Sequence, residues 1–111
     1  MCRALRVLCA ATSPERLAEL RSATVSAHWE LVGGATSTSE LLLQMEELNP
    51  DVVVVHSGLG AEAVAAARAL KEGVRIVAVG DLPGADLSIE SIQYVREAIL
   101  GLPRPGGPVL S

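Results

Sequence analysis

The stretch Asn49-Pro50-Asp51-Val52-Val53-Val54-Val55-His56-Ser57 decides the fold. Its Asn-Pro pair is typical of a turn that ends a helix. Four consecutive valines follow, and β-branched side chains favour a strand. Because this run is apolar on both faces, it is typical of a strand inside a parallel sheet. The stretch therefore predicts a buried central strand that ends at the polar residue His56.

Strands and helices alternate on both sides of this central strand. Apolar runs at residues 5–10, 29–32 and 74–79 predict three more strands, and Gly33-Gly34 closes the second of them. Helices are predicted at residues 14–24, 38–48 and 60–72. The expected caps of the first two helices are Thr12 and Ser37, because a glutamate follows each of them three residues later. The pattern predicts an α/β protein, a flavodoxin-like three-layer α/β/α sandwich with a parallel sheet of four to five strands.

The last third of the chain is too short for a complete alternation. Only residues 81–87 separate the fourth strand from the last helix, expected over residues 88–100. A helix of two turns alone needs about seven residues, so this interval cannot hold a helix and a strand together. We expect the fourth helix to be missing or reduced to Leu82-Pro83-Gly84, with a strand remnant at residues 86–89. Ile89, Ile92, Val95 and Ile99 are the expected core-facing stripe of the last helix.

Composition indicates one small cytoplasmic domain. The chain has 111 residues, of which 50% are hydrophobic, and its net charge of −4 is spread without a basic stripe, which argues against direct binding of nucleic acid. It contains no apolar run of membrane-spanning length, so no membrane partner is expected, and its first residues lack the pattern of a signal peptide. Cys2 and Cys9 are too few for a disulfide framework.

In this order the segments resemble the receiver domain of two-component response regulators. That resemblance implies a phosphate-accepting aspartate at the end of the third strand, where this chain has His56. It implies two magnesium-binding acids where the chain has Ala11 and Thr12, and a switch serine or threonine where it has Gly80. The lysine of the fifth strand has no counterpart, because the single lysine, Lys71, lies elsewhere. Phosphoryl transfer needs a nucleophile, a metal held by carboxylates and nearby cations, so neither catalysis nor a metal or other cofactor is expected.

The end of the chain is similar to LuxR/NarL-type transcription regulators. Residues 91–101 resemble their last receiver helix, and Pro108-Val109-Leu110-Ser111 resembles the entry to their DNA-binding helix-turn-helix domain. The resemblance implies a receiver-like domain at residues 1–101 and a linker at residues 102–111. That linker would lead to a helix-turn-helix domain absent from this chain.

The candidate ligand site is the crevice at the carboxyl ends of the strands, where open α/β sheets bind ligands. The residues expected to converge there are Thr12, Ser13, His56, Ser57, Gly80 and Asp81. The crevice either locks the domain in one state, which we favour, or binds a small metabolite. His56 could accept a phosphoryl group, a metal or a ligand, but a hydrogen bond to a neighbouring backbone group is the simpler interpretation. His28 is expected at the surface, and the glycine-rich segments at residues 33–34 and 57–60 match no phosphate-loop pattern.

The function that these residues indicate is control of dimerisation without phosphorylation. A dimer would present two attached helix-turn-helix modules to DNA, so self-association would set DNA affinity. The candidate interface residues are exposed positions of the last helix, Gln93, Tyr94, Arg96 and Glu97, or positions of the first helix. Two alternatives stay open: a phosphoryl carrier or small flavodoxin-like enzyme using Cys9 or His56, and a stand-alone adaptor. A buried, inert Cys9 is the simpler interpretation of that thiol.

Overall fold

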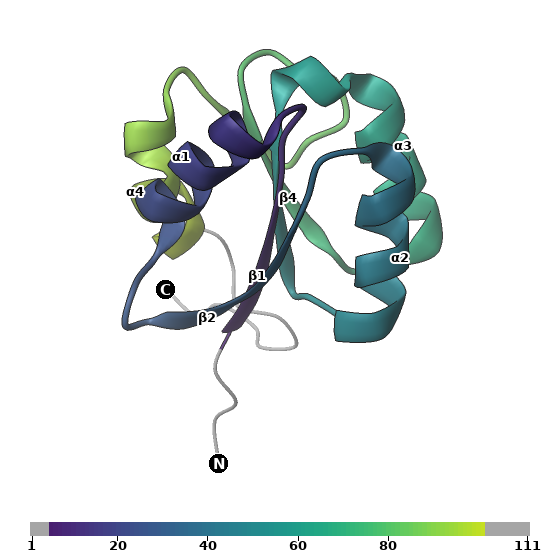
Figure 1. The fold of residues 1–111 in the computed structure, drawn as a ribbon, viewed down its shortest axis with the longest axis horizontal. Helices are drawn as coiled ribbons and strands as arrows, with labels where there is room; N and C mark the ends of the chain where they lie inside the picture. Colours follow the sequence, from purple (N-terminus) through teal and green to yellow (C-terminus); the bar gives the residue numbers. More distant parts are fainter. Residues whose placement is uncertain (1–4, 102–111) are drawn as a thin grey trace, which may run out of the picture.

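A computed structural model describes residues 5–101 as a five-stranded sheet between two pairs of helices (Figure 1). The strands are β1 (Leu5–Ala10), β2 (Trp29–Ala35), β3 (Val52–His56), β4 (Arg75–Val79) and β5 (Leu87–Ile89). All pair in parallel in the order β2-β1-β3-β4-β5. The helices are α1 (Pro14–Thr24), α2 (Thr38–Leu48), α3 (Ala61–Leu70) and α4 (Val95–Leu100), with short 3-10 turns η1 (Ser57–Leu59) and η2 (Ile92–Tyr94). The flavodoxin-like three-layer sandwich is confirmed.

The four valines of β3 hold the three layers together. Val53 and Val55 lie in the core under α2 and α3, and Val52 and Val54 lie in the core under α1 and α4. None is more than 1% exposed, because β3 is central in the sheet and a helical layer covers each face (Figure 1). Burial of each side chain contributes roughly 2 kcal/mol.

The first helix is capped one residue later than the sequence predicts. Ser13, not Thr12, is the N-cap, and its Oγ accepts a hydrogen bond from the Arg16 backbone N–H at 3.2 Å. The reason is Pro14, which occupies the first helical position and so makes the residue before it the cap. In α2 the predicted cap Ser37 is confirmed.

The glycine pair at residues 33–34 lies inside β2 instead of closing it. A Cβ at Gly33 would lie 2.5 Å from the Gln44 side-chain oxygen, and one at Gly34 would lie 3.0 Å from Leu17. The two glycines therefore let α2 and α1 approach opposite faces of the strand. The prediction that they end the strand was wrong, because it took a packing requirement for a turn.

The fourth helix is missing between β4 and β5, as the short interval predicts, and the strand remnant is the parallel strand β5. The last helix begins later than expected, because residues 87–89 pair with β4 and Ser91 then caps η2. Ile89 therefore lies on a strand instead of the last helix, although it still packs in the core under α1 and α4. Helix α3 also ends before Gly73, with Lys71 as its C-cap.

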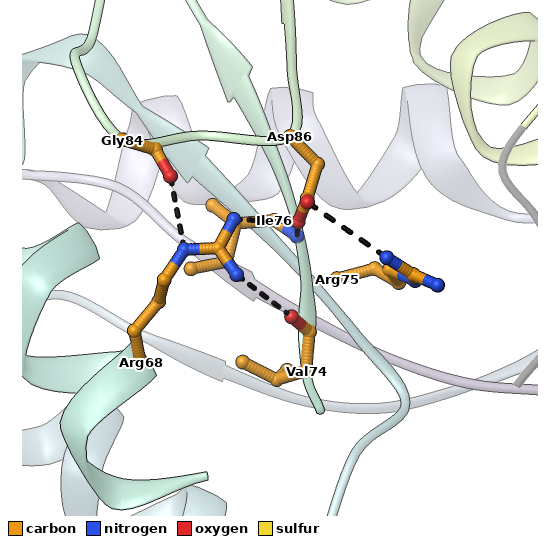
Figure 2. A network of polar contacts seen from close by, with 6 residues as sticks. All are labelled: Arg68, Val74, Arg75, Ile76, Gly84 and Asp86. Carbon is orange, nitrogen blue, oxygen red and sulfur yellow. Dashed lines mark hydrogen bonds and ion pairs between the residues drawn. The ribbon is translucent and has the colours of Figure 1, made fainter. Parts of the chain in front are cut away.

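A network of charged side chains occupies the connection between β4 and β5 (Figure 2). The Asp86 carboxylate accepts the Ile76 backbone N–H at 2.7 Å and pairs with Arg68 at 2.8 Å and with Arg75 at 3.9 Å. Arg68 also donates to the carbonyls of Gly84 and Val74. β5 pairs in parallel with residues 77–79 of β4. The connection therefore runs back along only part of β4 before β5 begins, and it does so without a helix.

Within residues 5–101, no helix is long and apolar enough to cross a membrane. The predicted linker at residues 102–111 and Cys2 lie outside the described residues.

Candidate functional site

The carboxyl ends of β1, β3 and β4 meet at one edge of the sheet, where the crevice was predicted. Ala11 continues the line of β1 into the core: it is fully buried, and its N–H donates to the Ala35 carbonyl at 3.0 Å. Thr12 is exposed, and the side chain of Ser13 is used as the cap of α1. The two positions that would hold magnesium in a receiver therefore supply a buried methyl group and a hydroxyl.

His56 acts as the cap of the η1 turn. Its Nδ1 accepts a hydrogen bond from the Gly58 backbone N–H at 3.3 Å. An accepting Nδ1 needs its lone pair, so a neutral ring carries its proton on Nε2. Partial burial lowers the pKa of His56 below its ordinary value, and the positive charge of Arg16 lowers it further, while Glu19 opposes the shift. The simpler interpretation of His56, a bond to a neighbouring backbone group, is confirmed.

The η1 turn packs closely against its neighbours on both sides. A Cβ at Gly80 would lie 2.6 Å from Ser57 Oγ, and one at Gly58 would lie 2.9 Å from the Thr12 methyl group. Gly80 also has a φ of +108°, which favours glycine. The structure thus brings together Thr12, His56, Ser57 and Gly80, and leaves Asp81 exposed one residue beyond.

The groups that phosphoryl transfer needs can be looked for at this junction. In the part of the chain that the structure describes, no three His, Cys, Asp or Glu side chains are grouped so that they could hold a metal ion. The side chains of Ser13 and His56 are both used as acceptors for backbone N–H groups. A phosphoryl group would find no carboxylate at the position of His56 and, within the described residues, no group of metal-binding side chains to hold a cation beside it.

Cys9 lies inside β1 and not in the loop after it. The residue is fully buried, and its Sγ lies 3.6 Å from Thr24 Oγ1. Burial raises the pKa of the thiol to about 11, so it stays protonated at neutral pH. A buried neutral thiol is not a nucleophile, and this position argues against the alternative of a Cys9 phosphoryl carrier.

The four predicted interface residues lie on η2 and α4. Gln93 and Tyr94 of η2 and Arg96 and Glu97 of α4 are all exposed, but the Arg96 guanidinium also donates to the carbonyls of Val25 at 2.7 Å and Ser22 at 3.2 Å. Arg96 therefore joins α4 to the carboxyl end of α1 and is already engaged within the domain. The single tryptophan, Trp29, donates from Nε1 to the Thr24 carbonyl at 2.7 Å, at the same end of α1.

A shallow groove of about 650 Å³ runs between α1 and the η2–α4 segment. It is lined by Ala18, Glu19, Ser22, Ala23, Ile92, Gln93 and Arg96. Tyr94, the last residue of η2, is not among the residues that line it. Sequence reasoning missed the groove, and it missed the hydrogen bonds from Arg96 to the carbonyls of Ser22 and Val25, because each depends on how distant segments pack. The small residues at positions 18, 22 and 23 on one side of α1 were the only signal for the groove.

Comparison with known proteins gives matches by structure alone. No protein-family model matches the sequence, and neither does any curated protein. Among solved structures, the signal receiver domain of NarL from Mycobacterium tuberculosis matches with a TM-score of 0.72 and 20% identity, over 89% of this chain and 95% of that one.

The response regulator domain of CheB from Thermotoga maritima gives a TM-score of 0.71 and 19% identity, over 88% of this chain and 92% of that one. The isolated receiver domain of RcsB from Salmonella enterica serovar Typhimurium gives a TM-score of 0.70 and 13% identity, over 88% and 87% of the two chains. This chain has the receiver fold. Identities this low show the fold and no more.

Proposed function

We propose that this chain is a receiver-like domain that works without phosphorylation and controls the dimerisation of an attached DNA-binding domain. The observation that carries the proposal is the state of the crevice. The position of the phosphate acceptor holds a histidine whose Nδ1 caps a backbone turn. The positions of the magnesium ligands hold a buried alanine and an exposed threonine.

The close packing around η1 supports a domain that is not switched by phosphorylation. Receiver switching would need the residue after β4 to change position, and Gly80 here lies directly against Ser57. The connection that follows is held by Arg68 and Asp86. A remodelled crevice and a shortened connection together leave no evident path for a phosphorylation signal.

The likeness to receivers of transcription regulators supports a DNA-binding partner domain. RcsB from Salmonella enterica serovar Typhimurium has been solved bound to the promoter rprA, and this chain covers 42% of that chain with a TM-score of 0.58. On this proposal residues 1–101 are the receiver-like domain and residues 102–111 a linker to a helix-turn-helix domain. An open reading frame that stops at Ser111 in the native gene would exclude the attached domain.

The proposed dimer surface is the exposed side of the η2–α4 segment, centred on Tyr94 of η2, which is 43% exposed. Exposed tyrosines favour interfaces because they offer a large, stiff apolar surface with a polar end. Arg96 is better understood as an internal contact, since its carbonyl partners at Ser22 and Val25 belong to the end of α1.

Sedimentation equilibrium with and without acetyl phosphate and magnesium tests the proposal. We expect a dimer whose association constant is the same in both conditions. A phosphorylatable receiver run beside it controls for an active phosphodonor. A monomer that dimerises only with the phosphodonor would overturn the proposal, as would a phosphoryl mass gain in the intact protein that disappears in His56→Ala.

A further inference from the structure

The η1 turn is held by one titratable acceptor. Its backbone N–H at Gly58 donates to His56 Nδ1, and the N–H of Gly60 closes the turn on the Ser57 carbonyl at 3.0 Å. The same turn carries Ser57 against Gly80 and Gly58 against Thr12. One histidine lone pair therefore stands at the junction of the loops that follow β1, β3 and β4.

Protonation removes that acceptor. An imidazolium has N–H groups on both ring nitrogens and accepts no hydrogen bond. The Nδ1–H of a protonated His56 would face the Gly58 N–H, so a hydrogen bond would become a repulsive contact. We propose that η1 is an acid-released turn: a proton on His56 breaks the cap on Gly58 and frees the turn from Thr12 and Gly80. This inference concerns the crevice itself and holds whether or not the domain dimerises.

Partial burial of His56, together with the charge of Arg16, keeps the turn closed at neutral pH. Arg16 and Glu19, both on α1, are the charged groups that act on the ring. Thr12, which packs on the turn from the β1 side, is uncharged. On the remaining sides the nearest chain segments carry Asp81 after β4 and Glu62 in the first turn of α3. Burial and Arg16 outweigh Glu19, so the pKa of His56 lies below its ordinary value and release belongs to acidic pH.

NMR titration of the wild-type domain from about pH 7.5 to pH 5 tests the inference. We expect the His56 ring and the Gly58 amide to titrate together, with one midpoint below the ordinary histidine value. Hydrogen-exchange protection of Gly58 should fall about fivefold across that midpoint, as expected for one lost hydrogen bond. A ring that titrates without moving the Gly58 amide would overturn the inference, as would a ring that stays neutral throughout.

Two variants complete the test. His56→Asn keeps a capping acceptor that does not titrate, so it should keep the Gly58 protection and lose its pH dependence. His28→Asn removes the other histidine, which is exposed and lies at the opposite end of the sheet, and should leave the response unchanged. A pH response of Gly58 that persists in His56→Asn would assign the proton to another group and refute the turn mechanism. If a variant does not fold, the wild-type titration alone decides.

Discussion

The crevice and the connection between β4 and β5 are two places where this chain differs from a complete receiver. Different interactions stabilise them. At the crevice, Thr12, His56 and Ser57 lie close together, and Ser57 packs directly on Gly80. At the connection, a whole helix is absent, and the ion pair of Arg68 and Asp86 occupies the junction. The first region therefore depends on volume and backbone conformation, and the second depends on charge. Mutations can test this contrast.

The largest effect is expected for Gly80→Ala. The new methyl group would meet Ser57 Oγ at 2.6 Å, and the φ of +108° is unfavourable for any side chain. We expect a loss of about 3 kcal/mol in the free energy of unfolding, measured by urea denaturation, with little dependence on salt.

Gly73→Ala is the matched control for that substitution. No atom lies within 4 Å of the place that its new methyl group would take, and its φ is not positive, so we expect a change within about 0.5 kcal/mol. Equal losses in the two variants would show that the crevice is no more tightly packed than a surface turn.

A smaller effect is expected for Asp86→Asn. The amide oxygen can still accept the Ile76 N–H, but the ion pairs with Arg68 and Arg75 are lost. The Arg68 and Asp86 side chains are 34% and 22% exposed, so we expect a loss of about 1 kcal/mol at low salt and less at high salt. Thermal denaturation at two salt concentrations measures it.

Glu19→Gln provides the comparison for Asp86→Asn. It breaks the more exposed pair with Arg16, at 3.6 Å, and should change stability very little. A loss on Asp86→Asn that does not depend on salt would contradict the view that charge stabilises the connection.

A still smaller effect separates wild type from His56→Asn as pH falls. The pKa of His56 is lowered in the folded state, so its contribution to stability is complete above the unfolded pKa. As pH falls below that value, the unfolded chain binds the proton more readily and the contribution is lost. Below about pH 6.5, the free energy of unfolding of wild type should therefore fall relative to that of His56→Asn. A difference that stays constant from pH 8 to pH 5 would refute this.

The smallest effect on stability is expected at a surface outside both regions. Tyr94→Ala should leave the free energy of unfolding within about 0.5 kcal/mol, because the side chain is 43% exposed, yet it should weaken self-association in sedimentation experiments. Leu43→Ala, at a 59% exposed position on α2, is the control and should leave association unchanged. Identical sedimentation profiles for wild type and Tyr94→Ala at matched concentration would remove Tyr94 from the interface.

The sequence predicted what depends on local pattern and on chain length. The run of valines gives the central strand because its apolar faces are visible without any partner. The missing helix follows from counting residues between Gly80 and the last helix, a limit that packing cannot change. The presence of Thr12 and His56 at positions where a receiver would have acidic residues was visible in the same way, since it requires only the residue at each position.

Features that depend on contacts between distant segments were not predictable. The glycines of β2 resemble a turn until α1 and α2 are in place on either side. Arg96 resembles a free surface cation until the end of α1 lies beside it. The pairing of Arg68 with Asp86 joins residues of α3 and of the connection, and their separation in sequence carries no periodic signal.

The carboxyl end of α1 gives this domain an intrinsic optical probe. Trp29 donates to the Thr24 carbonyl there, while Arg96 of α4 holds the adjacent carbonyls of Ser22 and Val25. Since the chain has one tryptophan, its fluorescence comes from a single environment that is 6% exposed. Separation of α4 from α1 would admit water beside the indole and shift its emission to longer wavelength. The position of the last helix can therefore be followed in real time in the unlabelled protein.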